Sequence, residues 1–145
     1  EEPVAAASSA EFNTWRASHQ DDLPPAEWQW FDVAIQEFKL ALMREGKLSG
    51  SGAIDEAVRA KIHGRPLADV MREGLQAHVR RKTAERAEMD AAFALNASRR
   101  IPPDDTATLR DMANHQENLR VKMNKLDQEI AAANAALAPL EARGR

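Results

Sequence analysis

The chain has 145 residues, of which 43% are hydrophobic and 30% are charged, and its formal net charge is −3. This length fits one ordinary domain, and the slightly acidic balance is unlike that of a dedicated, strongly basic nucleic-acid module. Cysteine is absent, which excludes disulfides, thiolate metal sites and a cysteine nucleophile. The apolar runs are only a few residues long and therefore predict no membrane-spanning helix.

The composition indicates an all-α protein. Only 6 glycines and no tyrosine occur, and the last two-thirds of the chain is rich in Ala, Leu, Glu, Arg and Lys, which favour helices. No segment alternates apolar and polar residues with the period of two that a half-buried strand requires. The sequence therefore predicts helices and no strands.

Residues 1–8 show no periodic pattern, so we expect a flexible tail there. The stretch from Glu1 to Ser9 is acidic, rich in small residues and contains Pro3. Such a start is typical of the mature end that is left after a signal peptide is removed. We therefore expect an exported, periplasmic-type protein, and a start produced by trimming a longer chain is the alternative.

Residues 9–63 are expected to form three short helices. Ser8 or Ser9 can cap the first of them through its side-chain oxygen. Pro24 and Pro25 suit the first turn of the second helix, where a missing N–H is harmless, and this helix ends before Gly46. The third helix occupies about 53–63, and the glycine that follows suits the left-handed conformation after a helix end.

Residues 66–143 are expected to form a long helical hairpin. Its first arm starts at Pro66 and reaches about Ser98, and its second arm occupies about 105–143. Pro102-Pro103 lies between the arms and cannot continue a helix. Two helices of similar length that are joined by a short loop lie antiparallel.

The second arm carries a ladder of residues at alternating three- and four-residue steps. Only Gln116 interrupts the apolar series. Such a narrow stripe predicts coiled-coil-like packing against another helix. The apolar members are Leu109, Met112, Leu119, Met123, Leu126, Ile130, Ala133, Leu137 and Leu140.

Together these segments predict one architecture. The fold is all-α, with a long antiparallel helical hairpin, coiled-coil-like, and three shorter N-terminal helices packed near its base. We expect a flexible tail over residues 1–8 and a single helical domain over 9–145. That domain is made of the short helices at 9–63 and the hairpin at 66–143.

No group of residues predicts catalysis, a cofactor or a metal ion. No serine lies in a Gly-x-Ser-x-Gly turn, and the glycines around Ser51 lack the lysine of a P-loop. His78 and His115 each have an acidic neighbour on their helix, but the hairpin register keeps these two pairs apart. We therefore expect no catalytic, cofactor-binding or metal-binding residues, and a protein that is not an enzyme.

A cluster of basic residues gives the best argument for nucleic-acid binding. It comprises Arg80-Arg81-Lys82 together with Arg72 and Arg86. On a helix these side chains point in several directions, and Glu85 and Glu88 lie among them. A solvated face with charge pairs is the favoured interpretation, because no exposed aromatic residues accompany the cluster for base stacking.

The end of the hairpin near its loop is the predicted interaction surface. Three short helices cannot cover the whole length of the hairpin, and large apolar patches rarely stay exposed on monomers. An exposed tryptophan on the second helix would mark a further part of a binding surface. The candidate residues are Met89, Phe93, Leu95, Leu109, Met112 and Trp30.

The expected function is that of a non-catalytic helical interaction or structural protein. It would self-associate or bind a protein partner through the hairpin, and a symmetric dimer is the simplest form. One alternative is a small periplasmic chaperone or stress-type binder. The other is a metal- or nucleic-acid-binding helical module.

Overall fold

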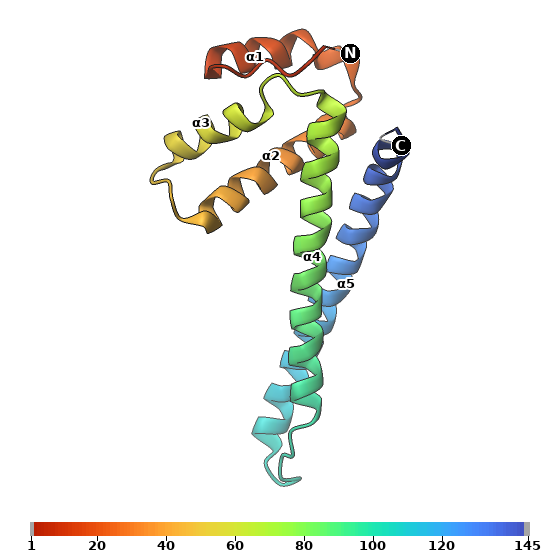
Figure 1. Ribbon diagram of the computed structural model, residues 1–145. Helices are drawn as coiled ribbons and strands as arrows, with labels where there is room; N and C mark the ends of the chain where they lie inside the picture. Colours follow the sequence, from red (N-terminus) through yellow and green to blue (C-terminus); the bar gives the residue numbers. More distant parts are fainter. Residues whose placement is uncertain (1, 144–145) are drawn as a thin grey trace. The chain divides into compact units, whose positions relative to one another are not determined.

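The chain folds into helices that are joined by short loops (Figure 1). The structure, a computed structural model, describes residues 2–143, and this range contains five α-helices, one 3₁₀ turn and no β-strand. Their bounds are α1 Ser9–Ser18, η1 Gln20–Asp22, α2 Pro25–Glu45, α3 Ser51–Ile62, α4 Leu67–Ala97 and α5 Thr106–Arg143. The all-α prediction is confirmed.

The helix ends follow from capping chemistry that the sequence contains. Oγ of Ser8 accepts a hydrogen bond from the backbone N–H of Glu11 at 3.1 Å and caps α1. Pro25 occupies the first turn of α2, where an N–H has no helical partner to lose. Gly46 and Gly64, with φ of 68° and 78°, adopt the left-handed conformation after α2 and α3, as predicted for Gly64.

The described chain divides into two compact units, and each is treated by itself. Unit 1 comprises residues 2–78 and 135–143, and unit 2 comprises residues 79–134. Both α4 and α5 contribute to each unit. The expectation of a single helical domain over 9–145 stays a prediction.

Unit 1 contains the larger apolar core. Aromatic rings of α1 and α2 meet there, and the planes of Trp28 and Phe31 cross at 90° with centroids 5.5 Å apart. Helices α2 and α3 pack side by side (Figure 1). The buried apolar residues are Val4, Ala6, Trp15, Trp28, Phe31, Ala34, Phe38, Val58, Ile62, Val70, Met71, Leu75, Leu137 and Leu140.

Helices α2 and α4 cross at a very short distance in unit 1. A Cβ atom built on Gly74 of α4 would lie 2.3 Å from Cβ of Ala34 on α2. Real Cβ atoms do not approach so closely, so only glycine fits at this crossing. The short approach also brings α2 against the part of α4 that carries His78, whose Nδ1 lies 2.8 Å from Oε2 of Glu37.

The start of unit 1 corrects the prediction of a flexible tail over residues 1–8. Glu1 lies outside the described residues, but Val4 and Ala6 are buried. The N–H of Val4 donates to the carbonyl of Arg65 at 2.8 Å. The N–H of Ala6 donates to Nδ1 of His63 at 2.9 Å. This packing could not be predicted, because a short extended segment has no helical period and its partner His63 lies 57 residues away along the chain.

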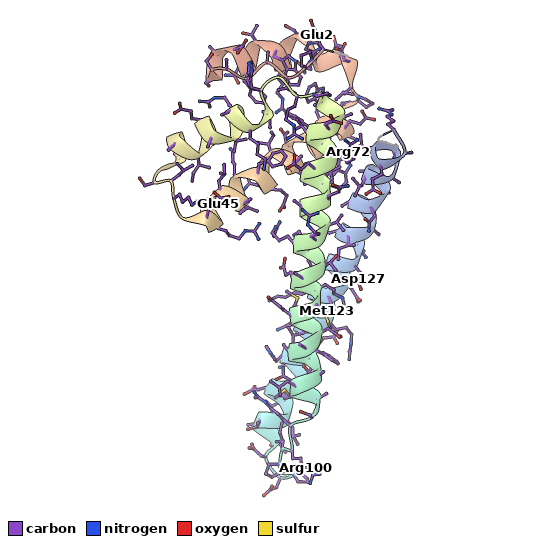
Figure 2. The ribbon with its side chains drawn as sticks, viewed as in Figure 1. Glu2, Glu45, Arg72, Arg100, Met123 and Asp127 are labelled. Atoms are coloured by element: carbon purple, nitrogen blue, oxygen red, sulfur yellow. The ribbon has the colours of Figure 1, made fainter. Side chains whose placement is uncertain are left out.

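In unit 2, α4 and α5 pack against each other through a thin apolar seam with charged and polar contacts at its sides. Met123, Leu126 and Ala133 of the ladder are buried in this seam, and Met123 and Asp127 lie on α5 in Figure 2. The polar contacts are Lys82 to Glu129 at 3.0 Å, Arg86 to Asp127 at 2.9 Å and Asn96 to Gln116 at 3.2 Å.

Candidate interaction surfaces

The predicted interaction residues of unit 2 divide into two groups. Met89, Phe93 and Met112 are half-buried within the helix pair. Leu95 and Leu109 are 61% and 40% exposed. The apolar surface that remains open therefore centres on the last turn of α4 and the first turn of α5, next to their loop.

Burial changes along the ladder of α5 within unit 2. Leu109 is exposed, Met112 and Leu119 are half-buried, and Leu126 is only 4% exposed. The stripe is thus covered by α4 at its middle and is open towards the loop. An apolar stripe that is open at one end leaves surface which a second molecule can cover.

Gln116, the one polar member of the ladder, has a defined structural role. Its Nε2 donates to the carbonyl of Phe93 at 2.9 Å, and its Oε1 accepts from Nδ2 of Asn96 at 3.2 Å. The guanidinium of Arg120 lies 5.6 Å from the centroid of the Phe93 ring. A polar residue inside an apolar seam fixes the register of the two helices. The break in the ladder was the signal for this role.

Trp30 belongs to unit 1, so the structure does not group it with the other five candidates. It is half-buried and lines an apolar groove of about 300 Å³. Leu67 and Met71 of α4 and Pro139 and Leu140 of α5 line the same groove, and Glu27 and Arg143 carry the charges there. The groove has the apolar lining of a binding site, with few polar groups to set orientation.

A larger and more polar hollow of about 860 Å³ lies along α1, η1 and the start of α2 in unit 1. Arg16 and Asp32 lie in its wall and form a two-pronged ion pair with distances of 2.6 and 2.9 Å. The guanidinium of Arg16 also stacks over the ring of Trp28 at 5.2 Å. Because these two charges neutralise each other, they offer little net charge to a charged ligand.

Trp15 carries the buried indole N–H that has no acceptor among the described residues. The equivalent N–H of Trp28 donates to the carbonyl of Gln20 at 3.0 Å. The two rings cross at 81° with centroids 5.9 Å apart. Both rings belong to the apolar core, in which Trp15, Trp28, Phe31 and Phe38 are all buried.

His19 joins the start of the chain to η1 through two carboxylates. Its Nδ1 lies 2.6 Å from Oδ2 of Asp22, and its Nε2 lies 2.7 Å from Oε2 of Glu2. The hydrogen bond to Asp22, with the charge of Glu2, raises the pKa of His19 above its ordinary value. These contacts hold the segment around Glu2 against η1. Among the described residues, they include no nucleophile that the imidazole of His19 could activate.

Four of the five members of the basic cluster lie close to carboxylates. Arg72 pairs with Asp69 at 2.6 Å, and Lys82 and Arg86 pair with acidic residues of α5. Arg81 lies 3.9 Å from Glu85. These contacts are those of a solvated face with charge pairs, which the helical spacing favoured.

Within residues 2–143, no group of three or more histidine or acidic side chains is close enough to hold a metal ion. No helix of the same range is long and apolar enough to cross a membrane. The expected lack of catalytic activity and of cofactors, and the exported location, stay predictions. Comparisons of this chain with protein-family models, with curated proteins and with solved structures each found no match.

Proposed function

We propose that this chain is a non-catalytic helical interaction protein that binds a protein surface through the loop end of unit 2. That surface comprises Leu95, Leu109 and the half-buried Phe93 and Met112. The observation that best supports this proposal is the exposure of two apolar residues near the loop. Leu95 is 61% exposed and Leu109 is 40% exposed, whereas Leu126 of the same helix pair is only 4% exposed. Exposed apolar residues in a cluster are the usual mark of a protein contact.

The proposal includes an antiparallel coiled coil as the support for this surface. Contacts support it, because residues further along α4 meet residues earlier along α5: Lys82 meets Glu129, whereas Asn96 meets Gln116. A paired helix arm holds side chains at its end in a fixed arrangement, and a rigid surface loses less entropy on binding.

A photo-activated cross-linker placed at residue 95 tests the proposal in the producing organism. We expect covalent adducts to a protein, either another copy or a different chain. Val121 supplies the matched control, because it is equally exposed at 59% on the same helix pair but does not belong to the ladder. Absence of adducts at residue 95, or equal adducts at 95 and 121, would refute the proposed surface.

A chaperone-like function is the second candidate, and the groove around Trp30 in unit 1 is the observation that favours it. An apolar groove of about 300 Å³ is large enough for one or two side chains of an unfolded client. If this function holds, Trp30→Asp lowers the suppression of aggregation of a heat-unfolded enzyme. Leu48→Asp, at an exposed apolar residue of unit 1 that does not line the groove, serves as the control and leaves suppression unchanged.

A further inference from the structure

The loop that joins α4 to α5 carries two basic residues followed by two acidic residues. Arg99 and Arg100 come directly after the last turn of α4, and Asp104 and Asp105 come directly before α5. All four side chains are exposed, and Arg100 is seen in the loop in Figure 2. The two signs of charge are therefore separated within one short loop.

The loop is built so that its own charges do not neutralise each other. Among the described residues, no ion pair within 4.0 Å involves any of these four side chains. Pro102 and Pro103 stand between the two charge pairs and restrict the backbone. The N–H of Asp105 donates to the carbonyl of Pro102 at 3.0 Å, which fixes the acidic side of the loop.

A surface that carries both signs side by side is complementary to itself. In a two-fold symmetric contact, residue i of one copy meets residue j of the other, and j meets i. A two-fold axis that passes midway between the two pairs, perpendicular to the line that joins them, sets the basic pair of each copy against the acidic pair of its partner. A second copy of this chain always carries the pattern of charges that this surface needs from its partner.

The apolar residues that flank the charges add the area that ion pairs alone cannot supply. Exposed ion pairs contribute little free energy to association and mainly fix orientation and partner choice. Leu95 and Leu109 are exposed, and Ile101 in the loop is half-buried. Burying these side chains against their copies would give the contact an apolar centre within a charged rim, as in protein interfaces generally.

We propose that the loop ends of two copies of this chain bind each other in a symmetric dimer, with Arg99-Arg100 of each copy facing Asp104-Asp105 of the other. This inference rests on the proposed function, since it uses the same surface and names its partner. A contact made by one loop and the few apolar side chains beside it lies at the small end of specific interfaces. The dimer is therefore reversible and dissociates on dilution, and added salt weakens it.

Charge exchange between the two sides of the loop tests the proposal. Analytical ultracentrifugation is carried out over a range of concentrations on the full chain and two variants, Arg99→Glu/Arg100→Glu and Asp104→Lys/Asp105→Lys. Each variant places like charges opposite each other in its own dimer, so we expect its dissociation constant to rise by roughly tenfold or more. An equimolar mixture of the two variants restores opposite charges on both sides, and we expect dimers to reappear.

Two further variants keep the result interpretable. Lys122→Glu/Lys125→Glu makes the net charge more negative by the same amount as Arg99→Glu/Arg100→Glu, but at exposed positions of α5 away from the loop, and it should dimerise like the unmodified chain. Oδ1 of Asp105 accepts from the N–H of Thr108 at 3.2 Å, so Asp104→Lys alone replaces the double variant if the latter loses helix content.

A chain that is monomeric at every concentration overturns the dimer, as does a mixture of variants that stays monomeric. Swapped variants that dimerise as well as the unmodified chain also overturn it. The cross-linker at residue 95 then shows whether only the dimer is wrong or whether the proposed interaction surface is wrong as well. Adducts to a different protein leave the proposed function standing without the dimer, whereas no adducts at all remove both.

Discussion

At the scale of single residues, Glu37 is a charged side chain that is buried within the described part of the chain. Only 2% of its surface is exposed. A buried carboxylate is costly unless it is hydrogen-bonded. Its Oε2 accepts from Nδ1 of His78 at 2.8 Å, within unit 1. The pair lies one helical turn from the tight crossing of Ala34 and Gly74, so it joins α2 to α4 where their backbones are already close.

Replacing Glu37 by alanine should lower the free energy of unfolding by about 2–3 kcal/mol, because a hydrogen bond to a charged group is lost. Glu37→Gln retains an oxygen acceptor for His78 and should cost less. Chemical denaturation monitored by circular dichroism gives both values. Glu45, an exposed carboxylate on the same helix, is the control, and equal losses for Glu37→Ala and Glu45→Ala would show that the buried bond does not stabilise the fold.

His19 gives a second prediction at this scale, on the pH dependence of stability. Since contacts with Asp22 and Glu2 raise its pKa in the folded chain, the folded state favours the protonated imidazole. The stabilisation is complete below the unfolded pKa of about 6.5 and is lost as the pH rises through the higher folded pKa. Thermal melts should therefore show His19→Gln to be destabilising at pH 5.5 and less so at pH 9.

The carboxylates themselves supply the control for His19. A Glu2→Gln/Asp22→Asn variant keeps the imidazole but removes both partners, so adding His19→Gln to it should have the same effect at both pH values. If the difference between the two pH values persists in that background, the carboxylates are not its source.

At the scale of helices, the sequence predicted what depends on local chemistry. The serine cap of α1, the proline start of α2 and the glycines after α2 and α3 each act within a few residues, and all are present. The buried segment around Val4 and the bond between Glu37 and His78 were missed, because each depends on residues far away in the sequence. Patterns within one helix carry no information about such partners.

Gly74 was also missed, since a lone glycine in a helix shows no sign of what it faces. Gly74→Ala favours the helix by up to about 1 kcal/mol in propensity. It nevertheless places a Cβ 2.6 Å from Cα of Ala34, so α2 and α4 must separate and the core of unit 1 loses contacts. We expect a net loss of about 1–3 kcal/mol, as for other overpacked cores.

Gly52 is the matched control for this substitution. It lies within α3, and a Cβ there would meet nothing within 4 Å. Gly52→Ala should therefore raise the midpoint of thermal unfolding slightly, while Gly74→Ala lowers it. A rise for both variants would mean that the crossing of α2 and α4 can open at no cost.

At the scale of the whole molecule, the candidate site was only partly predictable. The heptad ladder predicted an apolar stripe on α5. Of the residues near the loop that were named as an interaction surface, Leu95 and Leu109 are exposed and Met89, Phe93 and Met112 are half-buried, so their role in binding stays a prediction. Burial of Phe93 could not be predicted, because it depends on the contacts of Gln116 and Arg120 across the helix pair. Trp30 could not be assigned either, since its groove is formed by three segments far apart in the sequence.

The two units should also differ in stability, although α4 and α5 run through both. Unit 1 buries a cluster of aromatic and aliphatic side chains, whereas unit 2 buries mainly Met123, Leu126 and Ala133. Local opening is easiest where few apolar contacts hold a helix. Hydrogen exchange should therefore be slower for the amides of residues 70–78 than for those of residues 88–97 of the same helix, by roughly tenfold or more, which equals about 1.4 kcal/mol.

Hydrogen exchange measured at several protein concentrations also tests whether copies of the chain associate. If copies bind each other at their loop ends, raising the concentration stabilises the bound state by mass action. Exchange at residues 95–109 should then slow down, while exchange at residues 70–78 stays the same. The Arg99→Glu/Arg100→Glu variant is the control, since its weaker dimer should need a concentration that is higher by roughly tenfold or more for the same protection. Uniform protection along α4 at all concentrations would instead mean that both units open together and that the loop end remains free.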